Sequence, residues 1–291
     1  MDHVGHVLNP VIVTGASGYL GKRILKLLRE KGIESLGLGR SLGCDIVCDL
    51  CDKNAATMVF SKYQHCAVIH CAAVVPQYHN SYNDAKAASQ SVCMTQNLKE
   101  QKIKRVVFAS SMAVYPDGLV LAHEEHAQPV LSEYGKGKYA AESCLLNNTE
   151  VTTTVLRLPG LFGHPRRRGV LFNSAVALAK GVNPVLDSSL PQWAAMHVDD
   201  GAEICIRALL ASPKASMIMN AGYPERMSIS ASVSQLAALF GRTLDLPAPK
   251  WFEFDLSRLH AVLGPVVGRF SDRLNSLANW ARMNDASDTS Y

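Results

Sequence analysis

The sequence predicts an α/β protein: a doubly wound parallel sheet followed by a smaller, irregular lobe at the C-terminal end. Two observations support this fold class. Apolar, strand-like segments alternate with helical segments through the first half of the chain, and such alternation is typical of parallel sheets joined by right-handed crossovers. After residue 163 the pattern loosens, and loop-like stretches separate the remaining helices. The sheet is therefore expected to end, and the lobe to begin, near residue 163.

The predicted strands are short apolar segments, and helices or turns connect them. "VIVT" at 11–14 reads as a buried strand, which a glycine-rich turn joins to an amphipathic helix at 19–32. Further strands are expected at 34–41, 45–50, 67–74, 105–111 and 152–160, with helices at 52–63 and 84–102. Later in the chain, "PRRRG", "NPVLDSSLPQW" and "DLPAPKWFEFD" are loop-like.

The bulk composition indicates a soluble globular protein with a sizeable core. The chain has 291 residues, of which 48% are hydrophobic and 19% charged. Its net charge of +4 is too small to suggest nucleic-acid binding, but it suits an anionic small ligand. No apolar run approaches the roughly 20 residues of a membrane helix, and "MDHVGHVLNP" lacks the pattern of a secretory signal. We expect a cytoplasmic protein with a small-molecule substrate and no membrane partner.

Three of the eight cysteines have a spacing that iron–sulfur sites also use: Cys44, Cys48 and Cys51. Such a cluster needs its sulfurs to converge from a loop. Here "CDIVCDL" reads as a short strand, and alternation along a strand would leave Cys51 beyond its end. We expect free thiols and no metal site.

The first turn has the pattern of a dinucleotide site. Gly15 permits the tight turn, Gly18 lets a pyrophosphate approach the backbone, and Gly21 lets the helix pack on the strand. The helix that follows offers free N–H groups and a positive partial charge to an anion. The cofactor contacts expected in this turn are Gly15, Ser17, Gly18, Tyr19 and Leu20. The fold class is thus a Rossmann-type sheet.

The end of the second strand usually determines which dinucleotide binds, because it meets the adenosine ribose. An acid there suits NAD, but this chain has Gly39 and Arg40. Gly39 leaves room, and Arg40 can pair with a 2′-phosphate. NADP(H) is therefore favoured over NAD(H), unless Arg40 is simply a solvated cation. Asp49 and Leu50 are expected at the adenine, although Asp49 also suits an ordinary strand-end turn.

Tyr134 and Lys138 are one helical turn apart in "EYGKGKYAAE". A phenol needs about 4 kcal/mol to lower its pKa by three units, and a cation about 4 Å away at an effective dielectric near 20 supplies about that much. Gly135 and Gly137 each cost about 1 kcal/mol in this helix, so a close neighbour must compensate. Ser111 ends the strand 105–111, at the edge where such sheets bind ligands. The alternative for the tyrosine and the lysine is a solvent-facing helix surface.

These residues resemble the extended branch of the short-chain dehydrogenase/reductase family. The matching motifs stand in the family's order from residue 11 to about 210: "TGASGYLG", "HCAA" at 70–73, "FASSMAVYPD", "YGKGK", "LRLPGLFG" and "HVDD" at 197–200. The resemblance implies a nucleotide-binding domain of residues 1–163, to which 194–212 return, and a substrate lobe of 164–193 and 213–291. Further cofactor contacts that it implies are Cys71, Ala72, Ala73, Tyr134, Lys138 and Pro159.

The resemblance also implies catalytic roles for Ser111, Tyr134 and Lys138. In this family tyrosine is the acid in carbonyl reduction, lysine holds the nicotinamide ribose and lowers the tyrosine pKa, and serine orients the carbonyl. Many members act on nucleotide-linked sugars. Relatives often form homodimers through two long helices, here at 84–101 and 135–147, and the apolar residues on both permit this.

Departures from the family pattern narrow the chemistry. Met112 and Ala113 follow Ser111 where sugar 4,6-dehydratases have an acidic pair, and Ala113 replaces the cysteine of 3,5-epimerases. Trp193 stands where an arginine often grips the diphosphate, and Ser91 replaces a frequent asparagine. The loop of Arg166, Arg167 and Arg168 can supply the diphosphate contact instead, or be a solvated basic loop. The candidate substrate contacts are Ser111, His164, Arg167 and Trp193.

Three functions remain open from the sequence. The first is an NADP(H)-dependent reductase that acts on a ketone, with a nucleotide-linked keto sugar as the expected substrate. The second is a sugar-nucleotide 4-epimerase with bound NAD. The third is a non-catalytic, cofactor-binding regulatory subunit, against which the intact Ser111, Tyr134 and Lys138 argue.

Overall fold

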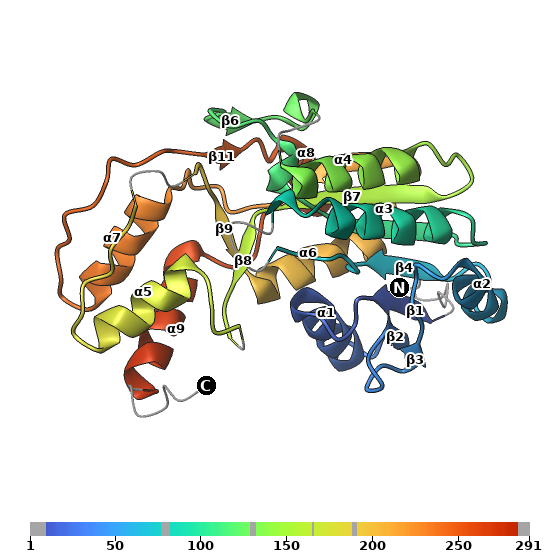
Figure 1. Cartoon of the computed structure of the whole chain (residues 1–291), viewed down its shortest axis with the longest axis horizontal. Helices are drawn as coiled ribbons and strands as arrows, with labels where there is room; N and C mark the ends of the chain where they lie inside the picture. Colours follow the sequence, from blue (N-terminus) through green and yellow to red (C-terminus); the bar gives the residue numbers. More distant parts are fainter. Residues whose placement is uncertain (1–9, 77–81, 129–131, 165, 188–190, 285–291) are drawn as a thin grey trace, which may run out of the picture.

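A parallel sheet of seven strands forms the centre of the protein (Figure 1). The computed structural model describes residues 10–284 except 77–81, 129–131, 165 and 188–190. The strand order is β10-β7-β5-β4-β1-β2-β3, and the pairings between these strands are all parallel. The strands are β1 (Val11–Thr14), β2 (Ser35–Gly39), β3 (Ile46–Val47), β4 (Ala67–His70), β5 (Arg105–Ser111), β7 (Thr152–Leu158) and β10 (Met217–Asn220). The order reverses between β1 and β4, which confirms the predicted Rossmann-type, doubly wound fold.

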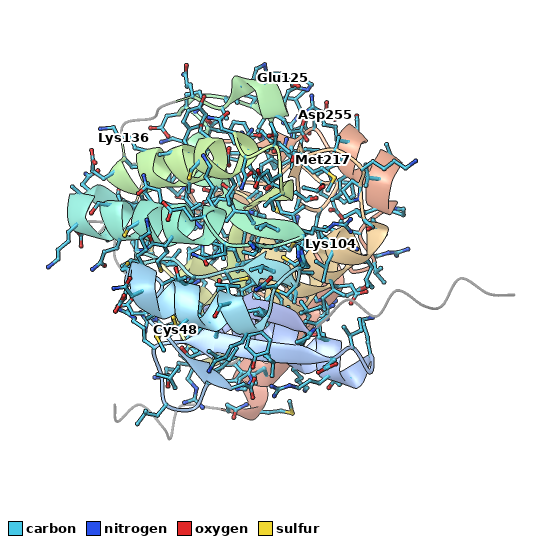
Figure 2. All side chains as sticks on the ribbon, turned by 90° about the vertical axis from the view of Figure 1, so that its right-hand side faces the viewer. Cys48, Lys104, Glu125, Lys136, Met217 and Asp255 are labelled. Carbon is cyan, nitrogen blue, oxygen red and sulfur yellow. The ribbon has the colours of Figure 1, made fainter. Side chains whose placement is uncertain are left out.

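Helices cover both faces of the sheet, because side chains alternate along each buried strand. On one face, Val11 and Val13 belong to the core cluster that includes Ile24 of α1 (Tyr19–Glu30) and Ile204 of α6 (Val198–Ala211). On the other, Ile12 belongs to a second cluster, with α2 (Lys53–Lys62), α3 (Ala85–Lys99) and α4 (Glu133–Leu146). Figure 2 shows side chains filling these layers, with Lys136 of α4 at the surface.

A smaller lobe lies beside the C-terminal edge of the sheet, at the left of Figure 1. It contains α5 (Val170–Ala179), α7 (Ile229–Leu239) and α9 (Phe270–Met283), which pack against one another. Two small parallel sheets accompany it: β8 (Gly160–Phe162) with β9 (Ala195–His197), and β6 (Leu121–Ala122) with β11 (Glu253–Phe254). Short 3-10 helices η2 (Met112–Val114) and η3 (Glu124–His126) follow β5 and β6, and α8 (Ser257–Leu263) packs on α6 and β10.

One segment lies elsewhere than expected. Residues 213–291 were expected in the smaller lobe, but β10 is the edge strand of the main sheet. Its residues Met217, Ile218 and Met219 pair with Thr154, Val155 and Leu156 of β7. The strand has only four residues, too few for an unambiguous pattern in the sequence. Within the described residues, no helix is both long enough and apolar enough to cross a lipid bilayer.

Candidate active site

Ser111 and Tyr134 lie together where β5 ends and α4 begins. Ser111 is the last residue of β5, and its hydroxyl accepts a hydrogen bond from the N–H of Ala113 at 3.2 Å. Tyr134 stands in the first turn of α4, and Ser132 caps that helix by accepting from the N–H of Gly135 at 3.1 Å. A hydrogen bond joins the side chains of Tyr134 and Ser111. The ring of Tyr82 meets that of Tyr134 edge-on at 5.6 Å.

Lys138 is buried one turn further along α4, but its ammonium group is directed at the sheet. Its Nζ donates to the carbonyl of Ala109 at 2.8 Å and lies 4.8 Å from the centre of the Phe108 ring. Burial lowers the pKa of Lys138 to about 8. The side chain therefore stays mostly protonated at pH 7.

The expected lowering of the Tyr134 pKa by Lys138 is not found in this structure. Burial raises the pKa of Tyr134 to about 12, and the hydrogen bond with Ser111 offsets only part of that rise. The reason is that the Lys138 ammonium donates to Ala109. At neutral pH the phenol is protonated, so in this state it can donate a proton but cannot accept one.

Gly137 brings α4 close to α3. A Cβ atom built on Gly137 would lie 3.0 Å from Cβ and 3.2 Å from the carbonyl oxygen of Ala88. The neighbouring helix is therefore the compensation that the sequence required for a glycine at this position.

The glycine turn has the geometry that a pyrophosphate needs. Gly15 has φ +68°, and a Cβ there would lie 2.8 Å from the backbone nitrogen of Ala72. A Cβ on Gly21 would lie 2.3 Å from the carbonyl oxygen of Gly15. α1 begins at Gly18 without a side-chain cap or an acid in its first turn, whereas Asp52 and Asp84 cap α2 and α3. The turn therefore fits the dinucleotide predicted from the sequence.

The other predicted cofactor contacts surround this turn. Cys71, Ala72 and Ala73 follow β4, and the N–H of Ala72 donates to Thr14 Oγ1 at 3.2 Å. Ser17 is exposed, Tyr19 and Leu20 are half-buried, and Pro159 is buried at the end of β7. The Tyr19 hydroxyl donates to the carbonyl of Gly163 at 2.6 Å, which joins the turn to the smaller lobe.

At the adenosine end, the structure agrees only in part with the expectation. Arg40 is exposed after β2 and has no ion pair with a residue that the structure describes. The room expected at Gly39 is taken, because a Cβ there would lie 2.9 Å from Cys44 Sγ. Asp49 accepts from the N–H of Cys51 at 2.9 Å, which is the turn that the sequence offered as the alternative. Leu50 is buried. All eight cysteines are free thiols.

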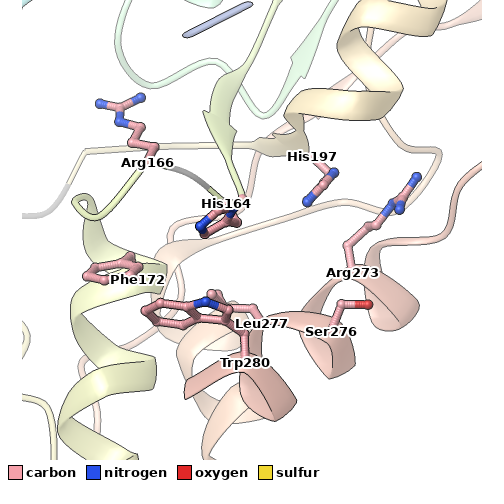
Figure 3. A pocket seen from close by; sticks show the side chains of 9 residues that line it. His164, Arg166, Phe172, His197, Arg273, Ser276, Leu277 and Trp280 are labelled. Carbon is pink, nitrogen blue, oxygen red and sulfur yellow. The ribbon is translucent and has the colours of Figure 1, made fainter. Parts of the chain in front are cut away.

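A pocket of about 70 Å³ lies between the loop after β8, α5, α9 and the start of α6 (Figure 3). Its lining residues are Gly163, His164, Arg166, Phe172, His197, Arg273, Ser276, Leu277 and Trp280. The guanidinium of Arg167 lies 5.9 Å from the Trp280 ring, and that of Arg166 lies 5.8 Å from the Tyr19 ring. The predicted contacts His164 and Arg167 thus meet at Trp280, whereas Trp193 packs against Gly160 and Ser111 belongs to the Tyr134 group.

Sequence reasoning missed Phe172, Arg273 and Trp280 as pocket residues. Phe172 comes from α5 and the other two from α9, about a hundred residues later in the chain. No local motif marks them. Arg273 also fixes the lobe, because its Nε donates to Asp200 Oδ2 at 2.9 Å and Tyr223 donates to the same carboxylate. Asp200 is the last residue of "HVDD", so this motif has a structural use at the lobe boundary.

Comparison with known proteins agrees with this geometry. The model of the NAD dependent epimerase/dehydratase family matches residues 11–222. The chain belongs to this family. As an epimerase/dehydratase family member, it shares the fold of the solved MoeE5 in complex with UDP-glucose and NAD: TM-score 0.78, 24% identity, 94% of this chain and 99% of that one.

Two curated relatives of this epimerase/dehydratase family chain differ in function. It is 28% identical to methionine adenosyltransferase 2 subunit beta of Bos taurus over 206 residues, covering 67% of this chain and 60% of that protein. It is 27% identical to the probable UDP-arabinose 4-epimerase 3 of Arabidopsis thaliana over 188 residues, covering 53% of this chain and 44% of that protein. The match therefore spans less than two thirds of the length of either relative.

Proposed function

We propose that this protein is an NAD(P)-dependent oxidoreductase that acts on a nucleotide-linked sugar. The observation that carries the proposal is the hydrogen bond between Tyr134 and Ser111, one helical turn from the buried ammonium of Lys138. A nicotinamide cofactor, when bound, supplies or accepts the hydride. The chain itself would hold that cofactor at the start of α1, orient a sugar oxygen with Ser111 and move its proton with Tyr134.

Reduction of a ketone with NADPH is the first form of this proposal. Burial raises the pKa of Tyr134 to about 12, so the phenol is a proton donor at neutral pH, as carbonyl reduction requires. The exposed Arg40, without an ion pair among the described residues, suits a 2′-phosphate.

Epimerisation at C4 with tightly held NAD is the second form. Similarity to a probable UDP-arabinose 4-epimerase and to a protein solved with UDP-glucose and NAD favours it. The same residues would serve: Tyr134 would take the proton of the C4 hydroxyl and later return it. That first step needs the phenolate, so it requires a lower pKa for Tyr134 than the value of about 12 to which burial raises it.

The pocket at Trp280 is the proposed site for the nucleotide part of the substrate. Arg166 lines the pocket and the Arg167 guanidinium lies 5.9 Å from the Trp280 ring, so both can serve as cations for a diphosphate. Trp280 and Phe172, with ring centres 5.3 Å apart, give an apolar wall for a base. The Tyr19–Gly163 hydrogen bond links this pocket to the glycine turn.

A regulatory role is the alternative from another class. Its support is the similarity to a methionine adenosyltransferase subunit, which would make this chain a cofactor-binding partner of a catalytic protein. The group of Tyr134, Ser111 and Lys138 would then hold a nucleotide without turning it over.

Identifying the nucleotide in the purified protein tests these functions. Mass spectrometry of the denatured protein should detect retained NAD for the epimerase, whereas a reductase would be empty and would bind added NADPH. Incubation with UDP-hexoses, and separately with a UDP-4-keto sugar and NADPH, then measures turnover, with Tyr134→Phe as the inactive control. Nucleotide binding without turnover of any UDP sugar would contradict the enzyme proposal and favour the regulatory one.

A further inference from the structure

A buried ion pair lies directly behind the candidate catalytic residues. Glu142 of α4 and Arg157 of β7 are each 2% exposed, and their closest atoms are 2.7 Å apart. Arg157 Nε also donates to Glu142 Oε1 at 3.1 Å. Charged side chains are rarely buried this completely, because removing them from water is costly unless each is fully paired.

Glu142 stands on the same face of α4 as Tyr134 and Lys138, since the three are spaced by four residues. Its carboxylate accepts a hydrogen bond from Ser110, the residue before Ser111 on β5. One carboxylate thus connects the helix that carries the tyrosine and the lysine with the strand end that carries the serine.

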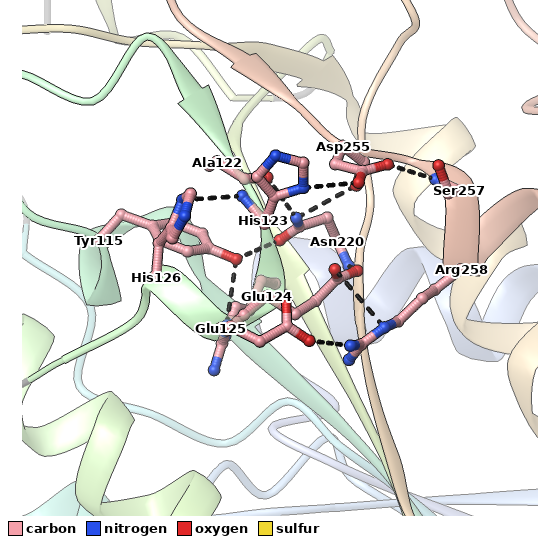
Figure 4. A network of polar contacts seen from close by, with 11 residues as sticks. Tyr115, Ala122, His123, Glu124, Glu125, His126, Asn220, Asp255, Ser257 and Arg258 are labelled. Carbon is pink, nitrogen blue, oxygen red and sulfur yellow. Dashed lines mark hydrogen bonds and ion pairs between the residues drawn. The ribbon is translucent and has the colours of Figure 1, made fainter.

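Arg157 is fully engaged as well. Its Nη1 donates to the carbonyl of Glu124 at 2.6 Å and to the hydroxyl of Tyr115 at 3.1 Å. That hydroxyl donates to the side chain of Asn220, whose amide group donates to Ala122 and Asp255. Figure 4 shows this network spanning η3, β10 and the small β6–β11 sheet. The guanidinium therefore binds Glu142 and, at the same time, η3 and Tyr115.

We propose that Glu142, held by Arg157, is a positioning residue for the candidate catalytic group: it fixes the β5 end that carries Ser111 and places a carboxylate one helical turn from Lys138. The consequence for catalysis rests on the proposed function, whereas the effect on Lys138 does not. Glu142 would act through Ser110 and Lys138 without touching the substrate.

The surroundings of Lys138 support this role. The Glu142 charge and the Cys71 thiol oppose the fall in the pKa of Lys138 that burial causes. Phe108 of β5 presents its ring to the ammonium, and His70 of β4 is neutral because burial lowers its pKa to about 3. Among the described groups that act on Lys138, Glu142 is therefore the one carboxylate. A pair with a merely structural role would stabilise the fold without altering the titration of Lys138.

The test is the titration of Lys138 in the cofactor-free protein, followed by NMR of ¹³C-labelled lysine and assigned with Lys138→Met. In the wild type about half of the Lys138 side chains should be protonated at pH 8, since the pKa of Lys138 is about 8. In Glu142→Gln, which can still accept from Ser110, the protonated fraction at pH 8 should fall well below half. Glu133→Gln is the matched control, because this half-buried glutamate of α4 pairs with Lys136 and should leave Lys138 unchanged.

Glu142→Gln leaves Arg157 buried without its partner, so this variant can fail to fold. Glu142→Gln/Arg157→Gln removes both charges and keeps the experiment informative. The proposal is overturned if either folded variant titrates Lys138 as the wild type does. If turnover exists, its alkaline limit should move to lower pH in Glu142→Gln. If neither the wild type nor any variant turns over a substrate, the proposed function is contradicted. The NMR result then still decides the role of Glu142.

Discussion

At the scale of single residues, the hydroxyl of Tyr134 bears the proposed proton transfer. Tyr134→Phe keeps the ring that contacts Tyr82 and removes only the hydroxyl that interacts with Ser111. We expect turnover to fall by about two to four orders of magnitude, the range for losing a positioned proton-transfer group, with cofactor affinity retained. Tyr139→Phe, on the same helix, is the control for a phenol outside the site. Near-normal turnover in Tyr134→Phe would refute the assignment.

The proposed preference for NADPH rests on Arg40, which is exposed after β2. If its charge meets a 2′-phosphate, Arg40→Ala should weaken NADPH by about ten- to a hundred-fold, since a hydrogen bond to a charged group is worth about 1.5–3 kcal/mol. NADH affinity should stay almost unchanged. Titrating both cofactors into wild type, Arg40→Ala and the control Lys26→Ala, an exposed cation of α1, measures this. A wild type that already prefers NADH would make Arg40 a bystander and favour the epimerase.

At the scale of elements, Gly137 permits the contact between α3 and α4. Gly137→Val would push a branched side chain against the backbone and Cβ of Ala88, where even a Cβ has only 3.0 Å. We expect a loss of roughly 1–3 kcal/mol, the usual cost of overpacking. Urea unfolding measures it against Ala140→Val, which places the same side chain on the exposed face of α4. Because valine forms helices better than glycine does, a Gly137→Val variant as stable as the wild type would mean that packing against Ala88 costs nothing.

The elements that the sequence predicted are those with local signals. The glycine turn, the parallel strands and the Tyr134–Lys138 spacing each follow from residues close together in the chain, and the turn contacts have the predicted geometry. The β6–β11 sheet could not be predicted, because two strands of two residues each, paired across 132 positions, show no periodicity. The Arg157–Glu142 pair looks like an ordinary strand cation and helix acid until the fold buries both.

Charge states were the least predictable property of the site. Spacing alone indicated that Lys138 would lower the pKa of Tyr134, but the direction of the ammonium and the depth of burial reverse the result. Both depend on packing between α4 and β5, and sequence spacing does not determine that packing.

At the scale of the whole molecule, side-chain contacts join the main sheet to the smaller lobe, and one of them involves a residue of a family motif. Asp200 of "HVDD" receives Arg273 from α9 and Tyr223 from the segment after β10. The Arg157 network makes a second junction, between the sheet and the β6–β11 pair. The candidate substrate pocket lies next to the first junction, and the candidate catalytic residues lie next to the second.

The stability of the whole fold should depend on one buried histidine. His70 is fully buried, its Nδ1 lies 2.7 Å from the hydroxyl oxygen of Thr14, and its ring stacks on Phe108. Burial, with a smaller effect of the Lys138 charge, lowers the pKa of His70 to about 3. Between that value and the ordinary pKa of 6.5, the unfolded chain binds a proton that the folded protein does not. The free energy of unfolding is therefore fully retained above pH 6.5 and falls as pH decreases, by at most about 1.4 kcal/mol per pH unit from this group.

Urea unfolding at pH 7.5, 6 and 5 should show a steeper loss of stability in the wild type than in His70→Asn, in which residue 70 does not titrate. His260→Asn removes an exposed histidine and should behave like the wild type. If wild type and His70→Asn lose stability in parallel, other groups control the acid limit of the fold.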